Sequence, residues 1–241
     1  MNPDVSIDEG SGLVRRVTGI GVAAHELKSP LVLLRQLSLE LADDALTEHE
    51  RARIAVQMTL VTEKALRLTS DLTRVESQTK LFELTPVNPL DVARDVRSEL
   101  QSLYSAHGRL LRVSRIHTLP PVIANRDLLR RILLNFADNA LHYTGPDDVV
   151  ELQAQLLADR SSVRLSIRDY GPHMPLANWK RLVTTLSDKQ SVHSRPQSSG
   201  LGLYISHEFA RHMNGRIGAI RHQDGASFYV ELPVSRQLSL L

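Results

Sequence analysis

The stretch that decides the fold is residues 150–169, VELQAQLLADRSSVRLSIRD. Two runs within it, 150–156 and 163–168, place an apolar side chain at every second position and polar side chains between them. A period of two is that of a β-strand with one buried face. The stretch therefore predicts two neighbouring strands of a sheet whose apolar face packs on a second layer.

Helical and strand-like segments alternate on both sides of this stretch. Helices are expected at about 89–106, 126–143 and 201–213, and short strands near 109–114 and 121–124. The segments GRIGAIRH and ASFYVELP, joined by QDG, predict a closing β-hairpin. Because helices interleave with strands, we expect residues 81–241 to form a two-layer α/β sandwich with helices on one face of the sheet.

Residues 13–80 follow a different pattern, in which apolar residues recur alternately three and four positions apart. The seam residues are Leu13, Val17, Ile20, Ala24, Leu27, Leu31 and Leu34, and then Ile54, Met58, Val61, Ala65, Leu68, Leu72 and Val75. Such a repeat is typical of heptad helices. The short polar link between the two segments carries Thr47 and Glu50 at the spacing of a capping box. We therefore expect an antiparallel helical hairpin.

The hairpin has more apolar surface than it can bury alone. We expect two copies to associate as a dimeric four-helix bundle, and packing of the hairpin on its own C-terminal domain is the alternative. Residues 1–12 are polar and contain glycine, which predicts a flexible N-terminal leader.

Composition excludes several classes of protein. The net charge is +2 without a dense basic block, so nucleic-acid binding is not expected. The sequence has 0 cysteines, which excludes disulfides and thiolate metal sites and fits a reducing compartment. It has no apolar run of about 18 residues and no signal-peptide pattern, so we expect no membrane span and a cytoplasmic location.

The segment HELKSP places His25, Glu26 and Ser29 on the first predicted helix, ahead of a helix-kinking Pro30. His25 and Ser29 are four positions apart and therefore share a helix face. A neutral imidazole is a competent nucleophile, and a neighbouring carboxylate holds its other ring N–H. The spacing alone leaves two interpretations open, a nucleophilic site or a histidine on a solvated face.

The segment NFADNALHYT lies on the predicted helix 126–143. Asn135, Asn139 and His142 fall on one stripe of it. The opposite, core-facing stripe is Leu129, Leu133, Phe136 and Ala140. Amide oxygens suit Mg²⁺, which usually keeps several waters. A solvated polar face is the alternative interpretation.

Two further segments contain glycine at turns. In SSGLGLYIS, Gly200 and Gly202 flank a predicted helix N-terminus, where free N–H groups and the helix dipole attract phosphate. The polar loop before it, 187–199, is long for a loop in a compact domain, and such long loops often serve as lids over binding sites. The segment DYGPHMP, 169–175, is by itself a turn after a strand.

Taken in order, these segments resemble the H-box, N-box and two glycine boxes of bacterial two-component sensor histidine kinases, over about residues 13–235. The resemblance implies a dimerisation and phosphotransfer hairpin followed by an ATP-binding sandwich of the Bergerat (GHKL) type. It also implies ATP and Mg²⁺ as cofactors and a response-regulator receiver domain as partner. His25 would accept phosphate from ATP and pass it to an aspartate of the regulator, Glu26 would assist as a base, and Ser29 would position water for regulator dephosphorylation.

The same resemblance assigns roles in the nucleotide site. Asn139 would ligate Mg²⁺, Asn135 and His142 would lie near the phosphates, and Tyr143 would pack on adenine. Asp169 would accept a hydrogen bond from the adenine amino group. The remaining cofactor-binding positions implied by the boxes are Gly171, Met174, Gly200, Leu201, Gly202 and Leu203.

The sequence departs from the family at two points. His173 stands where the first glycine box has its second glycine, and residues 179–189 have no phenylalanine where the family commonly has one. Reduced kinase activity is therefore expected. The alternatives are a regulator-binding dimer that is kinase-weak or inactive and acts as a phosphatase or scaffold, and another ATPase of the same sandwich class, such as a protein-serine kinase.

Overall fold

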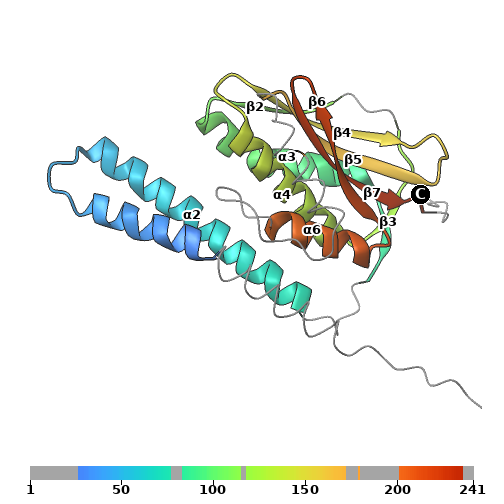
Figure 1. Cartoon of the computed structure of the whole chain (residues 1–241), viewed down its shortest axis with the longest axis horizontal. Coiled ribbons are helices and arrows are strands. Elements are labelled where there is room, and N and C mark those ends of the chain that lie inside the picture. Colours follow the sequence, from blue (N-terminus) through green and yellow to red (C-terminus); the bar gives the residue numbers. More distant parts are fainter. Residues whose placement is uncertain (1–26, 77–82, 115–117, 172–178, 180–200, 236–241) are drawn as a thin grey trace, which may run out of the picture. The chain divides into compact units, whose positions relative to one another are not determined.

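The structure is a computed structural model, which describes residues 27–76, 83–114, 118–171, 179 and 201–235. The chain divides into two units, the first formed by Met1–Gln78 and Gln190–Leu201 and the second by Thr79–Lys189 and Gly202–Leu241. The described part of the first unit is helical, and that of the second unit is the sheet with its helices (Figure 1).

The first unit contains a helix over residues 27–41 and helix α2, Glu48–Glu76. The two helices lie side by side as an antiparallel pair, which confirms the predicted hairpin for the described residues (Figure 1). The predicted capping box is formed: the Thr47 N–H donates to Glu50 Oε2 at 2.9 Å, and the Glu50 N–H donates to Thr47 Oγ1 at 3.3 Å. These reciprocal bonds satisfy two N–H groups at the start of α2. The hydrogen bonds from Thr47 lower the pKa of Glu50.

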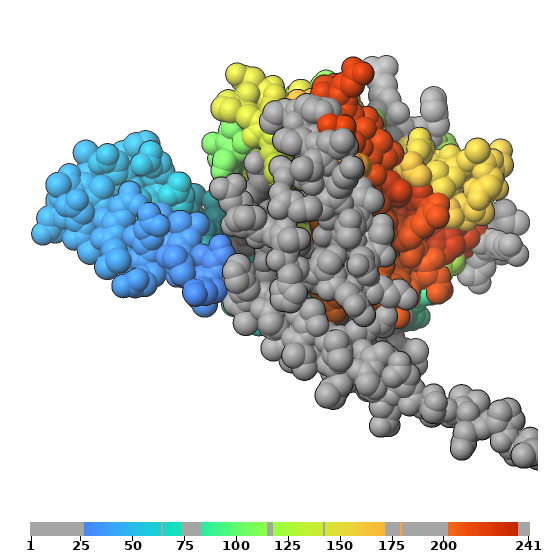
Figure 2. Space-filling model, viewed as in Figure 1, coloured from blue at the N-terminus to red at the C-terminus, as the bar shows by residue number. Residues whose placement is uncertain are grey.

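The hairpin buries only part of its apolar surface. Leu37 and Ile54 are buried, whereas the seam position Leu31 is 58% exposed, as expected of a hairpin that has more apolar surface than it can bury alone. The reason is geometric, because two helices cover only one side of each other. The large apolar side chains that stay exposed are Leu31, Val32, Leu33, Leu39, Val56, Leu60 and Leu66. Figure 2 shows the described part of the hairpin in blue and cyan.

The second unit is built on a mixed five-stranded sheet in the order β2-β4-β5-β7-β6. Its strands are β2 Leu110–Val113, β4 Val149–Leu156, β5 Ser162–Asp169, β6 Arg216–His222 and β7 Gly225–Pro233. Strand β2 is parallel to β4, and the other pairs are antiparallel. A separate two-stranded sheet pairs β1, Thr85–Val87, with β3, Val122–Ala124.

Three helices cover one face of the large sheet: α3 Pro89–Ala106, α4 Arg126–Tyr143 and α6 Leu201–His212 (Figure 1). The predicted two-layer sandwich is thus confirmed. Asparagines cap two of these helices, because Asn88 accepts from the Leu90 N–H at 3.0 Å and Asn125 from the Leu128 N–H at 3.1 Å. None of the helices in the described part of the chain has the length and hydropathy needed to cross a bilayer.

The core lies between the sheet and helix α4. The predicted apolar residues of β5 are buried, as are Val150 and Leu152 of β4, whereas Ala154 and Leu156 at the end of β4 are half-buried; the predicted stripe of α4 that includes Phe136 is buried. The rings of Phe136 and Phe228 lie 5.9 Å apart. Helix α4 is buried over more than that stripe, since Leu128, Ile132, Leu134, Ala137 and Leu141 are also buried. A single stripe was too narrow a prediction, because α3 packs beside α4 and the Tyr104 hydroxyl donates to Ala137 O at 2.7 Å.

The face of the sheet away from the helices is held by charged pairs. Glu231 on β7 is opposite Arg164 of β5 and Arg216 of β6, and its carboxylate accepts hydrogen bonds from both. The Arg164 guanidinium also lies 4.1 Å above the Tyr229 ring. Burial opposes ionisation of Glu231, but the two arginines outweigh it and lower the pKa of this carboxyl.

We predict that Glu231→Gln lowers the free energy of unfolding by about 1.5–3 kcal/mol, the range for hydrogen bonds to a charged group. A carboxyl whose pKa is lowered by folding stabilises the fold above its ordinary pKa of 4.5, and this contribution fades as the pH falls below that value. Thermal unfolding of the two proteins should therefore differ at neutral pH and converge in acid.

Asp91→Asn is the matched control, because it breaks the exposed pair between Asp91 and Arg94 on α3. Exposed pairs contribute about 0–1 kcal/mol, so its effect should be small at every pH. A gap between wild type and Glu231→Gln that stays constant down to low pH would contradict the assignment.

Candidate functional site

The end of strand β5 packs directly against the end of helix α4. Gly171 lies so close to α4 that a Cβ atom there would be 2.4 Å from the Tyr143 carbonyl oxygen. Real Cβ atoms do not approach backbone that closely, so only glycine fits at this position. Glycine is therefore required at position 171 by the close approach of the backbone after β5 to the end of α4.

Asp169 is buried at this junction, with 3% of its surface exposed. Its Oδ1 accepts hydrogen bonds from the Ala226 N–H at 3.1 Å and from the Gly171 N–H at 3.3 Å. Burial raises the pKa of Asp169, against the opposing effect of the two amides and of Arg168. A carboxylate in this setting is a fixed acceptor shielded from bulk water.

Arg168 supports the same corner from the other side of the sheet. Its guanidinium donates to Asp169 O, to Ala226 O at 3.4 Å and to Asp224 Oδ1 at 2.5 Å. It also lies 4.3 Å above the ring of Tyr170. Arg168 therefore joins the end of β5 to the turn between β6 and β7.

The start of helix α6 meets helix α4 at a second point. The Asn135 side-chain amide donates to Gly202 O and to Ser206 Oγ, each at 3.3 Å. A Cβ at Gly202 would lie 3.7 Å from its nearest neighbour among the described residues, Asn135, which is an ordinary contact. Packing within the described protein thus leaves Gly202 room for a side chain, unlike Gly171.

Helix α4 connects the two points. Asn135, Asn139 and Tyr143 recur every four residues and so share one face of the helix. With a rise of 1.5 Å per residue, the stretch from Asn135 to Tyr143 is about 12 Å long. One end of this face is next to Gly202 and the other is next to Gly171. The half-buried Asn139 lies between them.

The segment after α4 is tied down by Arg109. The Arg109 guanidinium donates to the carbonyls of Thr144 and, at 3.1 Å, Gly145. The Thr144 hydroxyl donates back to Ala140 O at 2.8 Å. These bonds fix the end of α4 against which Gly171 packs, a role for Arg109 that sequence reasoning missed.

A metal ion bound at this face of α4 would have few protein ligands. Among the described residues, no group of three or more His, Cys, Asp or Glu side chains is placed to hold a metal ion. Mg²⁺ binds through one or two protein oxygens and retains water, so a single Asn139 amide oxygen next to a phosphate fits it. The donor set is thus compatible with Mg²⁺ and unlike that of a closed metal cage.

The other predicted site residues are placed only in part. His25, Glu26, Met174 and Gly200 lie outside the described residues, as does His173. His142 and Leu201 lie in α4 and α6, and their side chains are outside the described part. Ser29 is exposed within the helical residues 27–41. Leu203 is buried, so its side chain belongs to the core.

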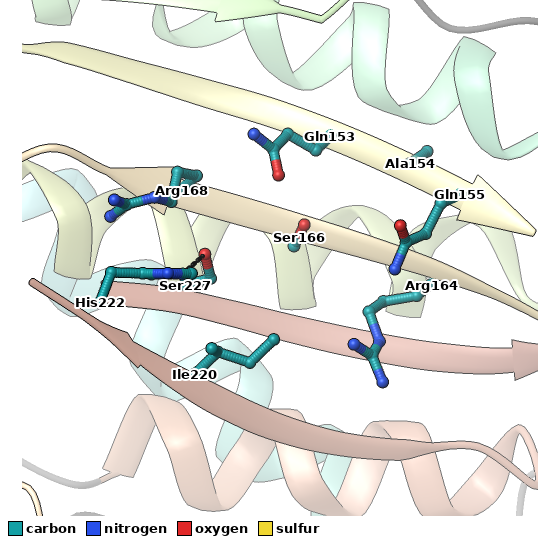
Figure 3. A pocket seen from close by; sticks show the side chains of 9 residues that line it. All are labelled: Gln153, Ala154, Gln155, Arg164, Ser166, Arg168, Ile220, His222 and Ser227. Atoms are coloured by element: carbon teal, nitrogen blue, oxygen red, sulfur yellow. Dashed lines mark hydrogen bonds between the residues drawn. The ribbon is translucent and has the colours of Figure 1, made fainter. Parts of the chain in front are cut away.

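A shallow polar pocket of about 240 Å³ lies on the opposite face of the sheet (Figure 3). Gln153, Gln155 and Ser166 line it with Arg164 and Arg168, and none of the predicted site residues does. At one end, His222 Nε2 lies 2.8 Å from Ser227 Oγ, close to Arg168 (Figure 3). The pocket is therefore separate from the face of α4 described above.

Comparison with known proteins gives the class of this site. Residues 124–236 match the sequence model of the family described as histidine kinase-, DNA gyrase B-, and HSP90-like ATPase. That match covers α4, β4, β5, α6 and the β6–β7 hairpin, the elements that form the site. Together with the curated relatives described below, this match supports a two-component sensor kinase catalytic domain.

The curated relatives are sensor kinases. The adaptive-response sensory kinase SasA of Prochlorococcus marinus is 25% identical over 216 residues, which is 88% of this chain and 56% of that protein. The alginate biosynthesis sensor protein KinB of Pseudomonas aeruginosa is 27% identical over 220 residues, 88% of this chain and 36% of that protein. The chain thus spans about half the length of SasA.

Solved structures share the fold. Histidine kinase AdeS of Acinetobacter baumannii is similar with a TM-score of 0.61 at 18% identity, covering 88% of this chain and 98% of that one. Full-length ShkA in complex with AMPPNP gives 0.62 at 22% identity, covering 89% and 47%. Histidine kinase ThkA in complex with the response regulator TrrA gives 0.59 at 19% identity, covering 88% and 60%.

We predict that Gly171→Ala lowers the free energy of unfolding of the second unit by about 1–3 kcal/mol, as overpacking usually does. The added Cβ would meet the Tyr143 carbonyl at 2.4 Å, and the end of α4 would have to move. Calorimetric unfolding of the variant measures this.

Gly145→Ala is the control, since its Cβ would make an ordinary contact of 3.6 Å with the Asp148 side chain. It should change stability by no more than about 0.5 kcal/mol. Equal stabilities of the two variants would refute the close approach at Gly171.

Proposed function

We propose that the chain is an ATP-dependent protein-histidine kinase, which phosphorylates its own His25 and passes the phosphate to an aspartate of a response-regulator receiver domain. The observation that carries the proposal is the face of α4, which meets Gly202 through Asn135 at one end and the Asp169 corner at the other. The AMPPNP complex of ShkA and the TrrA complex of ThkA support it, since both proteins share this fold.

In the proposed complex, ATP lies along α4 with its base at the Asp169 end. Asp169 accepts a hydrogen bond from the adenine amino group, and Tyr143 packs on the ring. The phosphates lie at the Asn135 end, where the N-terminus of α6 offers N–H groups and a positive dipole end. The backbone from Gly200 to Leu203 forms this cradle, and the room left beside Gly202 suits a phosphate oxygen.

Two further residues complete the nucleotide site in this proposal. His142, one turn beyond Asp138 on the same helix, contacts a phosphate, and Met174 contributes an apolar wall for the nucleotide. Asn139 holds Mg²⁺, whose charge neutralises the phosphate oxygens. Positioning and charge neutralisation by these groups supply most of the catalysis expected for phosphoryl transfer.

The proposed reaction transfers the γ-phosphoryl group to the His25 ring. An imidazole nitrogen of His25 attacks the γ-phosphorus, the bond to the bridging oxygen breaks, and ADP leaves with that oxygen. Glu26 orients the ring and takes the proton released from it. Ser29, exposed on the same helix, positions water for hydrolysis of the regulator's phosphoaspartate.

We also propose that the chain acts as a homodimer through its hairpin. Leu39 and Leu66 are 64% and 65% exposed, and they belong to the apolar set left uncovered by the hairpin. A second hairpin packed against the first would cover such residues in a four-helix bundle. The proposed domains remain a leader over 1–12, the hairpin over 13–80 and the ATP-binding domain over 81–241, in a cytoplasmic protein.

A second candidate function is a regulator-binding dimer with weak or absent kinase activity, acting as a phosphatase or scaffold. The observation that favours it is in the sequence, where His173 replaces a family glycine and residues 179–189 lack phenylalanine. A side chain restricts backbone freedom that glycine allows, which disfavours tight closure around a nucleotide. The hairpin and Ser29 would then carry the function.

We predict that labelled ATP with Mg²⁺ places an acid-labile, alkali-stable phosphate on the chain. His25→Ala should remove the label because the acceptor is gone, and Asn139→Ala should remove it because Mg²⁺ loses its protein ligand. His49→Ala is the matched control, since His49 is an exposed histidine of the same hairpin, and it should keep the label.

The other outcomes separate the alternatives. No label on the wild-type chain, with binding to a receiver domain intact, would favour the second candidate function. An alkali-labile label that survives His25→Ala would indicate a protein-serine kinase instead.

We further predict that Asp169→Asn weakens ATP binding at least about tenfold, by loss of a hydrogen bond to a charged acceptor. The amide keeps an oxygen for the Ala226 and Gly171 N–H groups but presents an NH₂ group to the adenine amino group. Titration calorimetry with ATP measures the loss.

In contrast to its ATP affinity, the stability of the Asp169→Asn variant should not fall. Because folding raises the pKa of Asp169, its charge costs free energy above that pKa, and the cost disappears as the pH falls through it. Asp169→Asn should therefore unfold no earlier than wild type at neutral pH, with the gap shrinking in acid. A variant that loses stability and binding together would count against the assigned role.

A further inference from the structure

The turn between β6 and β7 lies directly against Asp169. Strand β5 ends at Asp169, and its neighbour β7 begins at Gly225. The turn and the carboxylate therefore meet where these two adjacent strands end and begin. The turn residues involved are Asp224, Gly225 and Ala226. The role of this turn in the site is not visible in the motif pattern of the sequence.

Gly225 is the most constrained residue of the turn. Its φ is +119°, a backbone conformation open essentially to glycine alone. A Cβ there would be 2.3 Å from the Asp169 carbonyl oxygen and 2.5 Å from Asp169 Oδ1. Both the backbone angle and the lack of space therefore require glycine, and the space is limited by Asp169 itself.

Two sets of bonds hold the carboxylate and its backbone in place. On the side of the helices, the Ala226 N–H and the Gly171 N–H both donate to Asp169 Oδ1. On the opposite side, Arg168 bonds Asp169 O, Ala226 O and the Asp224 carboxylate, beside the pocket seen in Figure 3. The turn is thus joined to Asp169 through both its backbone and a charged side chain.

We propose that this turn is a positioning element for base recognition, with Gly225 as the residue that sets selectivity for adenine. The inference rests on the proposed ATP-binding function. With Oδ1 held by two amides, the carboxylate has one orientation, and its second oxygen is left to accept from the base. Holding an acceptor in its bound orientation before the ligand arrives lowers the cost of binding.

The test compares ATP with inosine triphosphate, which has an oxygen in place of the amino group. Wild type should prefer ATP at least about tenfold, as expected for a hydrogen bond to a charged acceptor. Gly225→Ala should reduce this ratio to about threefold or less while the affinity for inosine triphosphate stays within about twofold. Both are measured by titration calorimetry on the full chain with Mg²⁺.

Gly215→Ala is the matched control, because Gly215 is as crowded as Gly225 but lies at the other end of the same hairpin. Its Cβ would be 2.4 Å from Glu231 O and away from Asp169. The ratio of the two affinities should remain that of wild type, even where the variant is less stable. A fall of both affinities together in Gly225→Ala, or an unchanged ratio, would overturn the proposal.

If Gly225→Ala does not fold, Asp224→Ala tests the proposed positioning role of the turn instead. Asp224 is 65% exposed, so the chain tolerates its loss, yet Arg168 then loses one of its three partners in the corner. The ratio should fall about threefold, and Asp91→Ala, which breaks an exposed pair on α3, should leave it unchanged. A wild-type chain that binds both nucleotides equally would instead refute the proposed base contact, and with it this inference.

Discussion

The second unit depends on one constraint, the burial of the Asp169 carboxyl group. Burying a charge is costly unless hydrogen bonds compensate for it. Here the hydrogen bonds come from backbone N–H groups of two different segments, the end of β5 and the start of β7, and they offset only part of the cost of burial. These segments must therefore approach closely, and both approaches are possible only at glycines, Gly171 and Gly225. The carboxylate explains why the two glycines are needed.

Helix α4 holds the Asp169 corner at a fixed distance from the other end of the site, where Asn135 contacts Gly202. The helix is capped by Asn125, buried against both the sheet and α3, and tied at its end through Thr144 and Arg109. It also carries Arg126, which pairs with Asp95 of α3 at 2.5 Å. A helix fixed along its whole length holds its side chains at constant spacing. The stretch from Asn135 to Tyr143 is thus a rigid support for an elongated ligand.

Much of this was predictable from the sequence, because the relevant signals are local. The alternation in 150–169, the capping box at Thr47 and the helix over 126–143 each depend on neighbouring residues, and the structure confirms them. The contact of Gly225 with Asp169 was not predictable, because it joins positions far apart along the chain through strand order. The sequence also could not show that Leu31 stays exposed, since a heptad pattern does not say which helix will cover it.

The division of the chain into two units bears on the proposed chemistry. His25 belongs by sequence to the hairpin unit, whereas Asn135, Asn139 and Asp169, which are proposed to bind ATP, belong to the other unit. Phosphoryl transfer needs the reacting atoms within roughly 3–3.5 Å, so the two units must meet during each turnover. Base recognition at Asp169 needs no such meeting, because all its contacts lie within the second unit. Nucleotide binding should therefore survive changes to the hairpin that abolish transfer, since the two steps depend on different contacts.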